Sequence, residues 1–217
     1  MNKFFDSRFW PIHDRLWLTL HKTYQIIEEH SEKAKGNLLD IGGEKNRVFE
    51  IFEGKIKNYI SLDIKHNQNK SDLNVVGDGL NLPFKTNSID TVLCTQVLEH
   101  IKEPQIFVNE THRVLKKGGY CFLSTNMTWF FHAVPDDYYR FTESGLKYLF
   151  KNFSETEVYP AGGYISTLFA LTLLPFKYLP KPISFIPVTI LNILGKALDK
   201  LFFDSRLTTN LVILAKK

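Results

Sequence analysis

Short apolar runs, several of them closing on an aspartate, alternate with helical segments along this chain. This alternation constrains the fold more than any other feature. The candidate strands are Asn37–Ile41, Asn58–Asp63, Asn74–Gly77, Ile89–Thr95 and Tyr120–Ser124. Between the last two, the segment Pro104–Lys117 is amphipathic and stops at Gly118-Gly119. Short strands that alternate with helices predict βαβ units and a largely parallel sheet.

The flanking segments extend the α/β pattern at both ends. A first helix is predicted from His13 to Lys35, where apolar residues recur at three- and four-residue spacing. Thr142 is a candidate N-cap for a later helix, and strands are expected near Glu155–Tyr159 and at Thr208–Lys217. With 217 residues, the chain can fill one α/β core, so we predict a single domain. Its parts are a helical segment at 1–36, a core at 37–160, an apolar insertion at 161–207 and a last strand at 208–217.

The insertion is more apolar than a loop needs to be. No charge occurs from Val158 to Phe176, and a second uncharged run covers Pro182–Gly195. A membrane-spanning helix needs about 20 apolar residues; glycines and Pro175 interrupt the first run, and the second run is too short. Two interpretations stay open. The insertion either covers the cleft as a lid and apolar wall, or forms an interfacial hairpin that rests on a membrane with its lysines near the headgroups.

Charge and cysteine content narrow the class of protein. The formal net charge is +4 and the basic residues are spread out, which does not indicate nucleic-acid binding. Attraction to an anionic lipid or glycolipid surface stays open. Cys94 and Cys121 lie in apolar runs without metal-knuckle spacing, as expected of reduced core residues in a cytoplasmic protein. Charged residues interrupt the apolar N-terminus, so we expect no secretory signal there.

Acids follow three successive candidate strands. In open parallel sheets, ligands bind beyond the carboxyl ends of the strands, where Asp40, Asp63 and Asp78 fall. An acid after the second strand is well placed to accept hydrogen bonds from both hydroxyls of a ribose. Asp78 stands on a turn that could receive an exocyclic amine, with Leu80 and Leu82 against the base. Three acids together suit a nucleoside that carries positive charge.

The loop "LLDIGGEKN", residues 38–46, lacks the Gly-x-Gly-x-x-Gly pattern of dinucleotide sites. Those glycines let the backbone approach a pyrophosphate, and Glu44 would repel such a group. A cofactor without phosphate does not need them. S-adenosylmethionine has an adenine, a ribose, an amino acid tail and a sulfonium cation, and this loop suits it better than it suits NAD.

Five stretches, taken together, resemble the class I S-adenosylmethionine-dependent methyltransferases. The resemblance covers Asn37 to Asn126 and rests on "LLDIGG", "ISLDI", "VVGDGLNLPF", "IDTVLCTQVLEHI" and "RVLKKGGYCFLSTN". It implies a Rossmann-like sheet of seven strands, mostly parallel with the last antiparallel, and helices on both faces. It also implies S-adenosylmethionine as cofactor. From the resemblance and the turn after the third strand, we expect the cofactor to contact Asp40, Ile41, Gly42, Asp63, Ile64, Asp78, Gly79, Leu80, Thr95 and Gln96.

The acceptor is expected beside the segment that follows the fifth strand, "TWFFHAVPDDYYRFT". Aromatic faces beside carboxylates are suited to grip a sugar ring, and an arginine can pair with an acidic group. The segment is similar to that of methyltransferases associated with bacterial surface glycans. We therefore expect a hydroxyl or carboxyl acceptor on a small molecule, glycan-like or lipid-linked. The candidate substrate residues are Trp129, Tyr139 and Arg140, and the candidate bases are His132 and Asp137.

No metal ion is expected from the sequence. Glu99-His100 is similar to a pair that helps bind a divalent metal in methyltransferases of ubiquinone synthesis, together with an acid three residues earlier. Here Gln96 occupies that earlier position. We expect Glu99 and His100 to begin a helix and to shape the cleft wall.

Two other functions stay open. Glycine usually stands in this family where the chain has Glu44 and Asn46, which favours a non-catalytic methyltransferase fold that binds a partner through its insertion. A nucleotide-sugar or NAD enzyme could use the same kind of sheet, but the missing glycine pattern argues against it.

Overall fold

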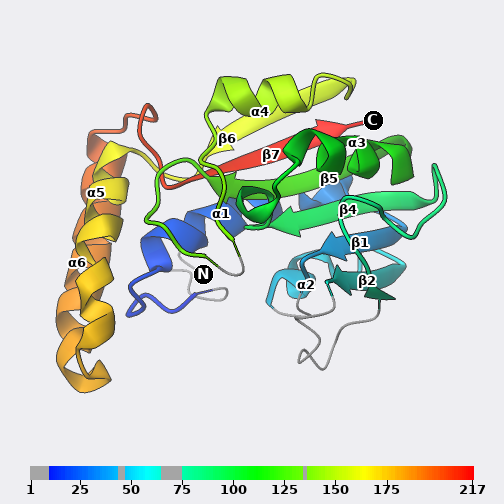
Figure 1. Ribbon diagram of the computed structural model, residues 1–217. Helices are drawn as coiled ribbons and strands as arrows, with labels where there is room; N and C mark the ends of the chain where they lie inside the picture. The colour runs from blue at the N-terminus through cyan, green and yellow to red at the C-terminus, as the bar shows by residue number, and fades with distance from the viewer. Residues whose placement is uncertain (1–9, 44–46, 65–74, 134–135) are drawn as a thin grey trace.

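The computed structural model describes residues 10–43, 47–64, 75–133 and 136–217. Within these ranges, seven strands form one sheet in the order β3-β2-β1-β4-β5-β7-β6 (Figure 1). Strands β1 to β5 run parallel, and β7 lies antiparallel between β5 and β6. The strands are β1 (Asn37–Ile41), β2 (Asn58–Asp63), β3 (Val75–Val76), β4 (Ile89–Thr95), β5 (Leu115–Asn126), β6 (Glu155–Pro160) and β7 (Asn210–Lys216). The seven-stranded, mostly parallel fold is confirmed.

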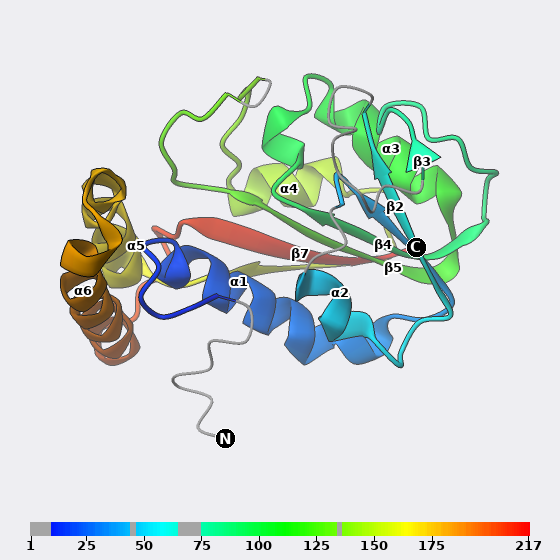
Figure 2. The same cartoon turned by 90° about the horizontal axis from the view of Figure 1, so that it is seen from below.

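Helices cover both faces of the sheet. Figure 2 shows α1 and α2 on one face and α3 and α4 on the other. Alternate residues along each strand point to opposite faces; in β1, Leu38 packs toward α1 and α2, whereas Leu39 packs toward α3 and α4. This alternation produces two buried clusters separated by the sheet. The helices are α1 (Trp17–His30), α2 (Arg47–Phe52), α3 (Pro104–Val114), α4 (Glu143–Leu149), α5 (Tyr164–Thr172) and α6 (Lys181–Leu201).

Most predicted elements lie where the sequence placed them. The bounds of β1, β2 and β4 are those predicted, and Thr142 caps α4 by accepting the Gly145 N–H at 3.1 Å.

Cys94 and Cys121 are free thiols buried in the core, and burial raises the pKa of Cys121 to about 12.

Several predicted boundaries were wrong, among them the start of the last strand, which is Asn210 and not Thr208. The first helix is shorter, because the α-helix ends at His30 and a 3-10 turn follows at Ser31–Lys33. Strand β3 comprises only Val75–Val76, while Asn74 lies outside the described residues. Strand β5 begins at Leu115 instead of Tyr120, so three residues assigned to the preceding helix belong to the sheet. Leu115 pairs with Ile89 of β4, and this pairing overrides the glycine stop signal.

The apolar insertion forms a helical hairpin beside α1. Helices α5 and α6 pack against each other and against α1, with a 3-10 turn at Leu174–Tyr178 between them (Figures 1 and 2). A third buried cluster joins them, made of Trp17, Leu18, Ala170, Leu173 and Val188. Trp129, from the segment after β5, packs against this cluster. Trp129 thus joins the predicted acceptor segment to the apolar cluster that α1 shares with the insertion.

Helix α6 is longer than its uncharged run predicted. It spans 21 residues without a break at Pro187 and includes Lys196, Asp199 and Lys200. Among the helices of the described ranges, it alone has the length and hydropathy to cross a membrane, a weak indication by itself.

Candidate active site

The predicted cofactor residues lie at the carboxyl ends of neighbouring strands. Asp40 and Ile41 end β1, Asp63 ends β2, and Thr95 ends β4. Because β1 pairs with both β2 and β4 in parallel, these strand ends meet at one edge of the sheet. The strands that form this edge, β1, β2 and β4, are the three whose first and last residues the sequence predicted correctly.

A glycine turn follows β1 at this edge. Gly42 has a φ of +76°, and its N–H donates to the Leu62 carbonyl at 2.8 Å. A Cβ atom at this position would lie 2.4 Å from Val97 Cγ2. Only glycine meets both demands without strain. The first part of the loop therefore keeps the close backbone turn that a cofactor requires, while residues 44–46 lie outside the described residues.

Two acids at this edge have different surroundings. Asp40 is 3% exposed and accepts a hydrogen bond from the Tyr59 hydroxyl. Burial and this negative charge raise the pKa of Tyr24 to about 12. Asp63 is 7% exposed and accepts the Ile64 N–H at 2.7 Å. The Asp40 carboxylate is thus held by a tyrosine of β2, whereas the Asp63 carboxylate is held by the backbone of the next residue.

The predicted adenine side forms a tight turn. Asp78 accepts the Leu80 N–H at 2.8 Å and forms an isolated backbone bridge with Asn81. A Cβ atom on Gly79 would lie 2.7 Å from the Phe107 ring, so a larger residue would displace the turn. Leu80 packs on the core beneath it.

Gln96 adopts a strained backbone conformation directly after β4. Its φ is +56°, and its side chain donates to Ser124 Oγ at 3.1 Å. It also accepts from Asn126 Nδ2 at 2.5 Å, and Asn126 in turn donates to Asn210 at 2.8 Å. Asn210 donates to Thr23 of α1. Strained non-glycine residues are concentrated at functional sites, and this buried amide network ties Gln96 to three elements.

The segment after β5 is held by an ion pair. Arg140 donates to both carboxylate oxygens of Asp137, at 2.5 and 2.6 Å, and the Asp137 side chain is 1% exposed. Asp137 also accepts the His132 backbone N–H at 2.9 Å. These contacts, the Arg140 hydrogen bonds above all, hold the pKa of Asp137 well below its usual range. A carboxylate held ionised in this way accepts a proton poorly, which leaves His132 as the base candidate.

The other predicted substrate residues lie on the same segment. Arg140 also donates to the Trp129 and Phe130 carbonyls, at 3.2 and 2.9 Å. The Tyr139 hydroxyl donates to the Lys102 carbonyl at 3.0 Å, and its side chain is partly exposed. With its further bond to the Tyr139 carbonyl at 2.7 Å, Arg140 uses all five guanidinium N–H donors within its own segment, and none is left for an acidic acceptor group.

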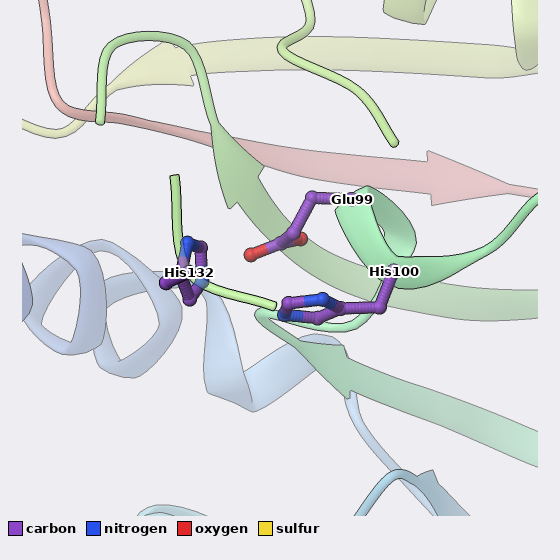
Figure 3. A group of neighbouring side chains, drawn as sticks. All are labelled: Glu99, His100 and His132. Atoms are coloured by element: carbon purple, nitrogen blue, oxygen red, sulfur yellow. The ribbon is translucent and has the colours of Figure 1, made fainter. Parts of the chain in front are cut away.

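A cluster that the sequence did not predict lies beside this segment. Glu99, His100 and His132 each present a ligand-type atom within 4.8 Å of the others (Figure 3). Glu99 and His100 belong to a single 3-10 turn, Leu98–His100, instead of the start of a longer helix. Burial raises the pKa of Glu99. The sequence did contain one indication of this cluster: its two segments follow β4 and β5, which are neighbouring strands whose carboxyl ends meet.

The core of the chain is similar to known methyltransferases. Residues 39–123 match the family described as a methyltransferase domain. A ubiquinone biosynthesis O-methyltransferase of Chromobacterium violaceum is 24% identical over 132 residues, which is 55% of each chain. The chain thus spans about half the length of the curated relatives it matches.

Solved methyltransferase structures share the fold of this chain. A SAM dependent methyltransferase from Archaeoglobus fulgidus has a TM-score of 0.59 and 16% identity, over 98% of both chains. A phosphoethanolamine N-methyltransferase of Haemonchus contortus, in complex with S-adenosyl-L-methionine, has a TM-score of 0.57 and 15% identity over 92% of this chain and 52% of that one. The resemblance to class I methyltransferases is confirmed, and S-adenosylmethionine is confirmed as the cofactor of the family.

Proposed function

We propose that this chain, whose residues 39–123 carry a methyltransferase domain, transfers a methyl group from S-adenosylmethionine to a hydroxyl or carboxyl oxygen of a small acceptor, glycan-like or lipid-linked. The observation that carries the proposal is the meeting of Asp63, the Gly42 turn and Gln96 at one edge of the parallel sheet. These groups suit a ribose and an amino acid tail, and none of them requires a phosphate.

The acceptor side of the proposal rests on the segment after β5. Methyl transfer from a sulfonium is a displacement in line with the bond that breaks, and holding both reactants in near-attack geometry can supply about 7–11 kcal/mol of the barrier. Trp129 and Tyr139 offer aromatic faces to an acceptor. A hydroxyl acceptor must lose its proton, whereas a carboxyl has already lost it at neutral pH. His132 lies beside the Glu99–His100 turn, where it could take up the hydroxyl proton.

The proposed activity is tested by incubating the protein with S-adenosylmethionine and a panel of acceptors. Free sugars, acidic sugars and isoprenoid-linked sugars cover the proposed class. We expect release of S-adenosylhomocysteine above background with at least one of them. A protein that binds the cofactor but transfers no methyl group to any member would contradict the acceptor class.

An apolar stripe on α6 supports docking at a membrane surface. The stripe is made of Ile183, Ile186, Ile190, Leu194, Leu198 and Leu201, which are 36–70% exposed. Their three- and four-residue spacing places them on one face of the helix. On the opposite face, Asn192 donates to the Ile12 and Asp14 carbonyls, and Asp199 accepts the Gly163 and Ser166 N–H groups at the start of α5.

The polar face of α6 is thus engaged by protein, whereas the side chains of the apolar stripe stay largely open to solvent. This arrangement favours a helix that lies in the interface over one that crosses it. A cavity of about 370 Å³ between α1 and α6 has Lys22, Lys196 and Lys200 in its lining, which suits anionic headgroups. In this account the protein is peripheral, at the cytoplasmic face of a membrane.

The docking proposal predicts a loss of membrane binding when the stripe becomes charged. We expect Ile186→Asp with Ile190→Asp to lower the fraction bound to vesicles of phosphatidylcholine and phosphatidylglycerol more than tenfold in a flotation assay. Each isoleucine loses about 1.5–3 kcal/mol of apolar burial. Thr86→Asp with Ser144→Asp adds the same charge at exposed positions away from α6 and should float like wild type. Equal flotation of all three proteins would contradict the proposal, as would a wild-type protein that forms a dimer through this face and does not float.

A further inference from the structure

Three side chains from two separate segments converge beside the proposed acceptor site. Glu99 and His100 come from the turn after β4, and His132 comes from the segment after β5. Figure 3 shows the carboxyl group and the two rings turned toward one another. Their ligand-type atoms lie within 4.8 Å of one another, a separation that small side-chain shifts close around one ion.

The two histidines are oriented by hydrogen bonds at the same ring nitrogen. His100 Nδ1 lies 2.5 Å from the Asp136 carbonyl. His132 Nδ1 lies 3.2 Å from the Phe130 carbonyl and 3.3 Å from Asp137 Oδ2. When Nδ1 carries the proton toward these acceptors, Nε2 keeps a free lone pair. Histidine ligands of metals are oriented in the same way, by an acceptor at the other ring nitrogen.

Glu99 supplies a second and independent observation. Its side chain is fully buried, and one oxygen accepts the Thr125 hydroxyl at 2.8 Å. The other oxygen, Oε1, is buried without a hydrogen-bond partner among the described residues. A buried carboxylate oxygen without a partner is costly. A cation between the carboxylate and the two rings would remove that cost.

We propose that Glu99, His100 and His132 bind one divalent cation of the zinc type. Two imidazole nitrogens and one carboxylate oxygen favour Zn²⁺ or Co²⁺ over Mg²⁺ and Ca²⁺, which prefer oxygen ligands. Three protein ligands leave a coordination position open, as in catalytic zinc sites. The inference rests on the proposed function only for what fills that position, which would be the acceptor oxygen. His132 would then act as a ligand, and the cation would lower the pKa of the acceptor hydroxyl.

This set of metal ligands differs from the one that the Glu99-His100 sequence pattern suggested, in which the third ligand would stand at position 96. Gln96, the residue three positions before Glu99, bonds to Ser124 and Asn126 and belongs to the buried amide network. The third ligand is His132, which lies far along the chain and could be placed only by the fold. The expectation that no metal is bound rested on the absence of an acid at position 96, and position 96 is not part of the set proposed here.

The test is a titration of tag-free, chelator-treated protein with Zn²⁺ by calorimetry and with Co²⁺ by visible absorption. We expect one site per chain, and a 10- to 100-fold or greater loss of affinity in both His132→Ala and His100→Ala. His112→Ala removes a histidine outside the cluster and should bind like wild type. Mg²⁺ should not displace Co²⁺.

A separate readout keeps misfolded variants from being mistaken for support. Each variant is also titrated with S-adenosylmethionine and melted, because the cofactor residues lie outside the metal cluster. Equal Zn²⁺ affinity of wild type and His132→Ala, or no Zn²⁺ binding by folded wild type, would overturn the inference. A wild-type protein that binds Zn²⁺ but does not bind S-adenosylmethionine would instead overturn the proposed function and leave the metal site standing.

Discussion

Replacing Asp63 with alanine is expected to weaken S-adenosylmethionine binding by about a hundredfold or more. The carboxylate stands at the end of β2, where we propose that it accepts hydrogen bonds from both ribose hydroxyls. Hydrogen bonds to a charged group contribute about 1.5–3 kcal/mol each, and a factor of ten corresponds to about 1.4 kcal/mol. Equilibrium dialysis with labelled cofactor measures the loss directly.

Glu53→Ala is the matched control for this prediction. It removes the same charge from an exposed position just after α2, away from the strand ends, and should bind like wild type. Thermal unfolding of each variant checks that the loss comes from the site. Wild-type affinity in a folded Asp63→Ala protein would mean that the ribose is not held at the end of β2.

Replacing Arg140 with methionine is expected to lower the free energy of unfolding by about 3 kcal/mol, because it leaves a buried carboxylate without its counter-charge. Asp137 is 1% exposed at its side chain and receives two hydrogen bonds from Arg140. The pair also anchors Trp129, which packs on the third cluster, so the loss extends beyond the loop. Urea unfolding at pH 7 measures the change.

Arg206→Met is the control, because it removes an arginine whose pair with Asp204 is exposed to solvent and should change stability little. The pH dependence gives a second readout. The pKa of Asp137 is lowered in the folded state, so its stabilising contribution is present above the unfolded-state value of 3.8 and is lost as the pH falls below it. The difference between wild type and Arg140→Met should therefore shrink below about pH 4. A constant difference would show that packing, not charge, sets the cost.

The sequence predicted the strands of the proposed cofactor half well because their signals are local. Strands β1, β2 and β4 end where their apolar runs end, and Asp40 and Asp63 are the last or next-to-last residues of β1 and β2. The start of β5 was wrong for the opposite reason. Gly118-Gly119 marked a helix end, but Gly119 is held close to Asp90, where a Cβ atom would lie 2.7 Å from the Asp90 carbonyl oxygen. Contacts with a neighbouring strand decided that boundary.

The arrangement of the proposed acceptor half depends on contacts between residues that cannot be predicted from their spacing in the sequence. Asp137 and Arg140 were predicted as separate base and substrate residues, and the fold joins them because both belong to one folded loop. His132 approaches Glu99 only because β4 and β5 are neighbours in the sheet. The exposed stripe of α6 also required the fold, since the sequence showed an apolar segment but not which of its faces packs on α1 and α5.

The central claim is that the turn after β1 and the acids of β1 and β2 form a working S-adenosylmethionine site. Calorimetric titration of the full-length protein with S-adenosylmethionine, S-adenosylhomocysteine and NAD tests it most directly. We predict that the first two ligands bind at one site per chain and that NAD produces no heat of binding. A folded protein that binds neither sulfur nucleoside, or that binds NAD instead, would contradict the account.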